Sequence, residues 1–257
     1  MRSGFGHGAR LLRASYELVR QEPGLLWFPV VSICCVTVTA AFWIFEGAWI
    51  YAVEGPKFAY VIVFAVAVYS VTFVGIFFNV ALVGAAARNL EGEPAGVGEG
   101  CSVAWKRLGE IAGWAAFSVF VSFLLALIKS VKGLRWLGSA AGVAWSFATL
   151  FVVPVIALEG LDPEDARRRS FELARNNWQS ETGGLVALRA ALLVPGLLVY
   201  VAYRLLADDR VHSLAGKVML GCVLLGGAAV FVVASVVRQV FAVELYRAGT
   251  PKLPFAA

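Results

Sequence analysis

Charged residues are scarce in this chain of 257 residues. Asp, Glu, Lys and Arg together make up 15% of the sequence, whereas hydrophobic residues make up 60%. A soluble domain averages about 25% charged and about 45–50% apolar residues. The composition therefore excludes an ordinary soluble globule, an intrinsically disordered chain and a disulfide scaffold. It indicates an integral membrane protein.

Residues and motifs that carry out chemistry are also few. The chain has two histidines and four cysteines, and the cysteines form no C-x-x-C pair. It contains no H-E-x-x-H, P-loop or G-x-S-x-G motif. Because no strand precedes Gly92, Gly96, Gly98 and Gly100, we interpret these glycines as a flexible connection. We expect no catalytic residue, no metal ion and no cofactor.

Six apolar runs reach or approach the roughly 20 residues that a helix needs to cross a bilayer. They cover residues 24–45, 58–87, 111–128, 138–158, 183–203 and 219–237, and the last continues toward Tyr246. The second run is longer than a bilayer requires, so we expect it to tilt or to project. We interpret the first run as a retained span, because the long segment before it contains Glu17 and Glu22. The sequence therefore predicts six transmembrane helices.

The basic residues indicate how these helices are oriented. The net charge is +5, and the lysines and arginines flank the apolar runs. This pattern is typical of membrane orientation, so we expect no nucleic-acid partner. With six spans both termini lie on one side, and that side carries twice as many basic residues as the other. The positive-inside rule then predicts a protein of the cytoplasmic membrane with both termini in the cytoplasm.

An eight-residue pattern occurs twice. Residues 13–20 read RASYELVR and residues 168–175 read RRSFELAR, each on a short amphipathic segment before an apolar run. Residues 102–108 form a weaker third copy. Glycine and then proline follow the second, fourth and sixth runs, where glycine can end a helix and proline prevents its continuation. We infer one membrane domain over residues 1–257, built from three units whose approximate bounds are 8–94, 99–163 and 163–251.

Each unit is predicted to be a short cytoplasmic interfacial helix followed by a two-span hairpin. An even number of spans per unit makes these units parallel repeats. Chance similarity between short amphipathic segments is the alternative. Basic side chains on the short helices are candidates to bind lipid phosphates or a partner protein, and a merely solvated helix face is the other interpretation. These candidates are Arg10, Arg13, Arg20, Lys106, Arg107, Arg167, Arg168, Arg169 and Arg175.

Polar residues within or at the ends of the spans form a second set of candidates. They are Glu46, Asn79, Arg189, Arg238 and Glu244. A charge at the bilayer centre costs at least about 2.5–3.5 kcal/mol, and no acidic residue lies in mid-span, which argues against a proton-coupled transporter. Arg189 could bind an anionic lipid or substrate, but we favour a structural arginine. For Asn79 we favour a hydrogen bond between helices.

Two prolines, Pro154 and Pro195, interrupt the fourth and fifth runs. Such prolines can free backbone carbonyls to line a pore or a binding site. Packed kinks are the more common outcome and are the interpretation that we favour.

Several segments resemble one family of membrane proteins. They are residues 77–86 (FFNVALVGAA), residues 144–154 (AWSFATLFVVP), Glu159-Gly160, Arg169-Ser170 and Ala242-x-x-Leu-Tyr-Arg247. The chain is similar over most of its length to domain-of-unknown-function family 6159, which comprises uncharacterised prokaryotic multi-pass membrane proteins. The resemblance implies a multi-pass architecture and supplies no catalytic residues.

The sequence thus predicts an all-α integral membrane protein. The leading hypothesis for its function is a non-enzymatic scaffold or accessory subunit that binds membrane lipids, a partner membrane protein or further copies of itself. A passive channel or transporter for a small or hydrophobic molecule is the first alternative. The second alternative is a membrane-embedded lipid-modifying enzyme, which requires at least two of Glu46, Arg189 and Glu244 to converge on one pocket.

Overall fold

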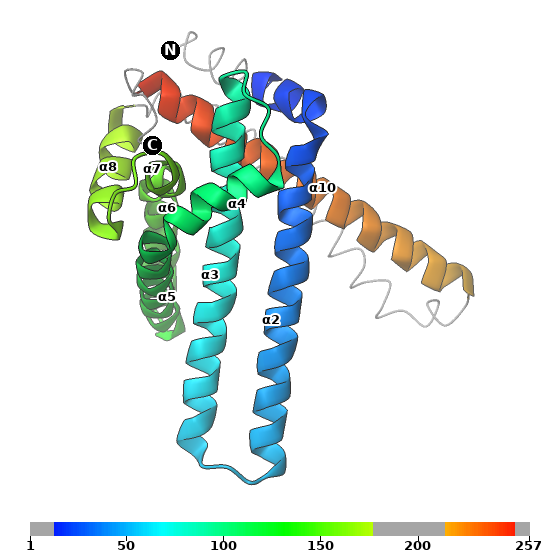
Figure 1. Cartoon of the computed structure of the whole chain (residues 1–257). Coiled ribbons are helices and arrows are strands. Elements are labelled where there is room, and N and C mark those ends of the chain that lie inside the picture. Colours follow the sequence, from blue (N-terminus) through cyan, green and yellow to red (C-terminus); the bar gives the residue numbers. More distant parts are fainter. Residues whose placement is uncertain (1–12, 177–213, 250–257) are drawn as a thin grey trace.

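The computed structural model describes residues 13–176 and 214–249 (Figure 1). The predicted all-α class is confirmed for these residues, which contain no strand. After a first helix over residues 13–21 the elements are η1 (Pro23–Leu26), α2 (Trp27–Ala52), α3 (Lys57–Leu90), α4 (Val97–Lys106), α5 (Leu108–Ser130), α6 (Arg135–Ala148), α7 (Val152–Leu158), α8 (Pro163–Asn176) and α10 (Leu214–Gly249).

Four helical segments in the described part of the chain are long and apolar enough to cross a membrane. They are Pro23–Ala52, Lys57–Leu90, Leu108–Ser130 and Gly226–Arg247. They contain or overlap the first, second, third and sixth apolar runs. The fifth run lies outside the described residues, together with Arg10, Arg189 and Pro195. These apolar helices are compatible with a membrane location.

The fourth apolar run does not form the one continuous span that the sequence predicts. It forms two helices, α6 and α7, separated by residues 149–151. Pro154 lies in the first turn of α7, where its missing N–H breaks no helical hydrogen bond. A continuous helix would need that N–H to bond to the preceding turn, so the chain interrupts the helix before the proline.

The core is concentrated at one end of the molecule, which we call the head. All eight residues from Val80 to Ala87 of α3 are buried there, and α4, α7 and the C-terminal half of α10 pack around them. The other end of the α2–α3 hairpin projects from the head (Figure 1). Residues 57–79 of α3 span about 34 Å at 1.5 Å per residue, which matches the hydrocarbon thickness of a bilayer.

Glycines end two of these helices, as the sequence predicts. Gly92 follows the end of α3 with φ of 82°, and Gly160 follows the end of α7 with φ of 65°. After α3, the Gly92 N–H donates to the Asn89 carbonyl over 3.1 Å, and the Glu93 N–H donates to the Arg88 carbonyl over 3.1 Å. This pair of bonds is a Schellman motif, which satisfies carbonyls at the helix end.

The interpretation of the glycine segment as a flexible connection is wrong for Gly98 and Gly100, because α4 begins at Val97. The Glu99 carboxylate accepts the Gly96 N–H over 2.9 Å and so caps this helix. Hydrogen bonds from the backbone N–H groups of Glu99 and Gly96 hold the pKa of the Glu99 carboxyl below its ordinary value. Local capping thus outweighs the low helix propensity of glycine here.

Candidate functional site

The C-terminal end of α10 is bonded to the ends of two other helices. The Tyr246 hydroxyl donates to Glu159 Oε1 over 2.6 Å, and the Arg247 guanidinium forms an ion pair with Glu91. Glu91 and Glu159 are the acidic residues of two Leu-Glu-Gly segments, at the ends of α3 and α7. Two adjacent residues of α10 therefore hold two equivalent glutamates. Arg169 and Glu172 lie beside them. We use the name polar junction for the six residues Glu91, Glu159, Arg169, Glu172, Tyr246 and Arg247.

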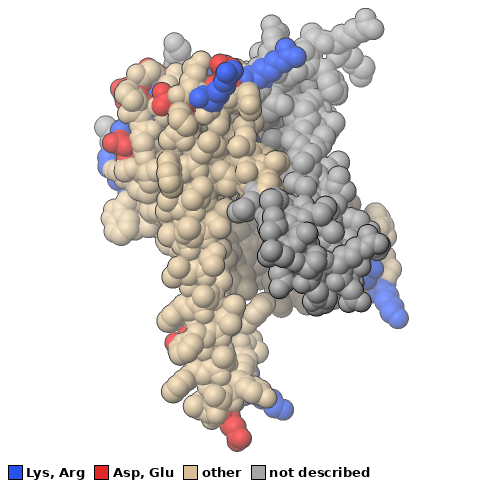
Figure 2. Space-filling view, turned by 90° about the vertical axis from the view of Figure 1, so that its right-hand side faces the viewer, with Lys and Arg blue, Asp and Glu red and all other residues tan. Residues whose placement is uncertain are grey.

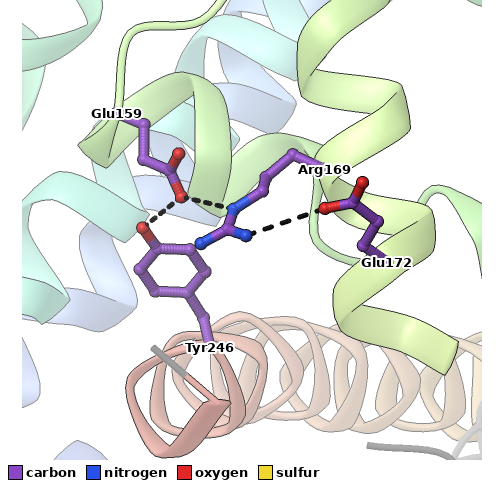
Figure 3. Close-up of polar contacts among 4 residues, drawn as sticks. All are labelled: Glu159, Arg169, Glu172 and Tyr246. Atoms are coloured by element: carbon purple, nitrogen blue, oxygen red, sulfur yellow. Dashed lines mark hydrogen bonds and ion pairs between the residues drawn. The ribbon is translucent and has the colours of Figure 1, made fainter. Parts of the chain in front are cut away.

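Glu159 is the centre of the polar junction (Figure 3). Arg169 of α8 donates from Nε to the same oxygen, Glu159 Oε1, over 3.4 Å. The other side of this guanidinium lies 3.8 Å from Glu172 Oε2. The Glu159 side chain is 16% exposed and Tyr246 is 5% exposed. A half-buried carboxylate that already accepts two donors suits a structural link between α7, α8 and α10.

The three consecutive arginines of α8 have different surroundings. The Arg167 guanidinium lies 5.5 Å from the centre of the Phe117 ring, in a cation–π contact. Arg168 bonds to Glu164 over 2.6 Å with both side chains about two-thirds exposed, and Arg169 belongs to the polar junction. Of the three, Arg168 has the side chain most available to a ligand.

The remaining basic candidates also divide into exposed and packed side chains. The described ones that are exposed are Arg13, Arg20, Lys106 and Arg175. Arg107 is half-buried, lies 3.9 Å from Glu110, and covers Gly160, where an added Cβ would overlap its guanidinium. Arg107 therefore stabilises the turn after α7.

Of the four described polar candidates of the spans, Glu46, Asn79 and Glu244 lie in separate places, and Arg238 is exposed on α10 next to Gln239. Asn79 accepts a hydrogen bond from Gln239 Nε2 over 3.1 Å, which joins α3 to α10. Glu244 lies in the head and forms a side-chain hydrogen bond with the buried Ser15. Glu46 lies near the end of α2 that projects from the head. The enzyme hypothesis requires at least two of Glu46, Arg189 and Glu244 to converge on one pocket. Glu46 and Glu244 do not converge.

The profile of a family of unknown function, DUF6159, matches residues 57–249. The chain belongs to DUF6159. No curated protein and no solved structure matches it.

The DUF6159 match contains all six residues of the polar junction. Four of them, Glu159, Arg169, Tyr246 and Arg247, lie in segments that carry the family resemblance, yet only Arg169 is among the predicted site residues. The recurrence of Leu-Glu-Gly after α3 and α7 is a sequence signal that could have identified the two glutamates. No comparable sequence pattern identifies Gln239, the hydrogen-bond partner of Asn79.

Loss of the Tyr246 hydroxyl tests how much the polar junction stabilises the fold. We expect Tyr246→Phe to lower the free energy of unfolding by about 1.5 kcal/mol, because a hydrogen bond to a charged group is lost. Thermal unfolding of the detergent-purified protein measures the change. Tyr51→Phe is the control, because Tyr51 is 77% exposed on α2. Equal thermal midpoints for Tyr246→Phe and the unmodified protein would contradict this role.

Proposed function

We propose that the protein is a non-enzymatic multi-pass membrane component whose short helices bind lipid headgroups. The observation that carries the proposal is an exposed aromatic side chain beside basic residues on each of three short helices. Tyr16 is 55% exposed on the first helix, Trp105 is 70% exposed on α4, and Phe171 is 55% exposed on α8. Aromatic rings and basic side chains together are typical of membrane–water interfaces.

The distribution of charge supports this assignment. On the α2–α3 hairpin, Lys, Arg, Asp and Glu side chains gather toward the tip, and further charges gather at the head, with an uncharged surface between them on the face shown in Figure 2. Another group of basic side chains lies at the right edge of that view. A helix hairpin with such an uncharged surface fits the bilayer, and its charged ends fit the two headgroup layers. In this arrangement the head lies at the cytoplasmic surface, together with both termini.

A repeated architecture is part of the proposal. Ser15 and Ser170 occupy equivalent positions in the two copies of the eight-residue pattern, and both are fully buried. Four positions later, Val19 and Ala174 are also buried, so the two helices use the same face for packing. The paired Leu-Glu-Gly ends add support for three parallel units and six spans.

The lipid proposal is tested by the retention of anionic lipid. The test variant combines Lys106→Gln, Arg168→Gln and Arg175→Gln, and native mass spectrometry counts the phosphatidylglycerol bound by the detergent-purified protein. We expect a several-fold loss of bound lipid, because basic side chains near a membrane contribute about 1 kcal/mol each. The control combines Lys129→Gln, Lys132→Gln and Arg135→Gln around the α5–α6 turn, which changes the net charge equally. Equal losses in the two variants would contradict headgroup binding by the short helices.

A passive transporter for a hydrophobic molecule is the second candidate. It is favoured by an apolar groove of about 440 Å³ between α2 and α3, lined in part by Trp43, Gly47, Phe64 and Ala67. This volume is typical of small-molecule sites. Ala67→Trp would obstruct the groove, so it would lower the flux of a hydrophobic dye into proteoliposomes if this candidate were correct. Under the lipid proposal, the same variant should bind as much phosphatidylglycerol as the unmodified protein does.

A further inference from the structure

Two helices of the head present the same exposed face. On the first helix the face consists of Arg13, Tyr16, Glu17 and Arg20, and on α8 it consists of Arg168, Phe171, Glu172 and Arg175. All eight residues are exposed. In each helix they occupy positions i, i+3, i+4 and i+7, which lie on one side of an α-helix. We call this arrangement the repeated face.

Packing does not account for the repeated face. The similarity of the buried positions follows from the core that they share, since Ser15 and Val19 pack inward like Ser170 and Ala174. Exposed positions tolerate most substitutions with little effect on stability. One exposed aromatic residue is ordinary, but the same ring type between the same three charges on two helices indicates a common ligand.

The chemistry of the repeated face indicates a ligand with both signs of charge. A guanidinium binds a phosphate through charge-assisted hydrogen bonds. Three and four positions after this arginine, one helical turn away, come an aromatic ring and a carboxylate. Each lies one turn from the guanidinium, and together they suit an ammonium group that donates to the carboxylate and contacts the ring. Residues one turn apart have Cβ atoms about 5–6 Å apart, so one small headgroup can reach both.

We propose that each repeated face binds the headgroup of a phosphoethanolamine lipid. The phosphate lies on the arginine at position i, and the primary ammonium lies between the ring at i+3 and the glutamate at i+4. The second arginine, at i+7, attracts the phosphate of a neighbouring lipid. This inference rests on the proposed lipid-binding function and names its ligand class.

The existing ion pairs leave the α8 face open to this ligand. Arg168 already bonds to Glu164, but both side chains are about two-thirds exposed, and such surface pairs contribute little, so a phosphate can replace Glu164. Glu172 lies 3.8 Å from Arg169 and remains 65% exposed. A purely anionic headgroup is repelled by the glutamate, and a choline headgroup has no N–H to donate to it.

Lipid titration followed by native mass spectrometry tests the inference on the full chain. The probes are phosphatidylethanolamine, phosphatidylglycerol and phosphatidylcholine with identical acyl chains. We expect two phosphatidylethanolamine molecules to bind most tightly. Glu17→Gln and Glu172→Gln should each weaken one of these sites about tenfold, because each removes one charge-assisted contact. The same substitutions should strengthen phosphatidylglycerol binding, because they remove a repulsive charge.

The control is Glu93→Gln, which removes an exposed carboxylate outside the repeated faces. It should leave the affinities for phosphatidylethanolamine and phosphatidylglycerol unchanged. Equal affinities for the three lipids, or a loss of phosphatidylglycerol binding in the glutamate variants, would overturn the inference. A preference for phosphatidylglycerol that depends on Arg168 and Arg175 would overturn it while leaving the proposed function in place. Absence of binding by all three lipids would overturn both.

Discussion

Replacing Gly100 with alanine should lower the free energy of unfolding by about 3 kcal/mol, the upper part of the range for overpacked cores. An added Cβ would overlap the carbonyl oxygen of Ala81 and lie 2.6 Å from Phe28 Cζ. Ala81 belongs to the fully buried segment of α3, and Phe28 is itself fully buried. Neither group can move without displacing the core, so α4 must separate from α3. Thermal unfolding in detergent, followed by tryptophan fluorescence, measures the loss.

Gly98 provides a control on the same helix. It is exposed, and a Cβ there meets nothing within 4 Å, so Gly98→Ala should leave stability unchanged or raise it by up to about 1 kcal/mol through better helix propensity. Similar thermal midpoints for Gly98→Ala and Gly100→Ala would show that helix propensity, and not the contact between α3 and α4, controls this region.

The same two glycines show where prediction from the sequence succeeds and where it stops. Apolar runs give the location of helices α2, α3 and α5, because burial in lipid requires long uncharged segments. Glycine followed by proline correctly gives the ends of α3 and α7. The sequence predicts a flexible connection at the four glycines between α3 and α5, because the role of Gly100 depends on a surface of α3 that local spacing does not reveal.

The contacts of the polar junction, and the partner of Asn79, could not be predicted from the sequence for a related reason. Tyr246 and Glu159 are 87 residues apart, and Gln239 and Asn79 are 160 residues apart. Periodicity along a helix shows which side of that helix is apolar, but not which distant helix it contacts. Only the recurrence of Leu-Glu-Gly linked two of the participating positions. The sequence therefore predicts the long apolar helices, whereas the contacts between helix ends come from the structure.

Ser170→Ala is expected to be the most disruptive loss of a single polar atom, lowering the free energy of unfolding by about 3 kcal/mol. Ser170 is fully buried, donates from Oγ to the Ala148 carbonyl over 2.7 Å and accepts the Phe151 N–H over 3.1 Å. It thus bonds to both sides of the break between α6 and α7. Alanine leaves both backbone groups without this partner beside a fully buried Phe151, and each unpaired buried group costs about 1–3 kcal/mol.

Ser146 supplies the matched control, because its hydroxyl donates to the Gly142 carbonyl within α6 and the residue is exposed. Ser146→Ala should change stability by less than about 0.5 kcal/mol. Ser170→Thr keeps the hydroxyl, so it should recover part of the stability that alanine loses. If Ser170→Ala unfolds at the same temperature as Ser146→Ala, then apolar packing around Phe151 and Pro154, and not the Ser170 hydroxyl, stabilises the chain between α6 and α7. If threonine behaves like alanine, the loss reflects the shape of the site and not its hydrogen bonds.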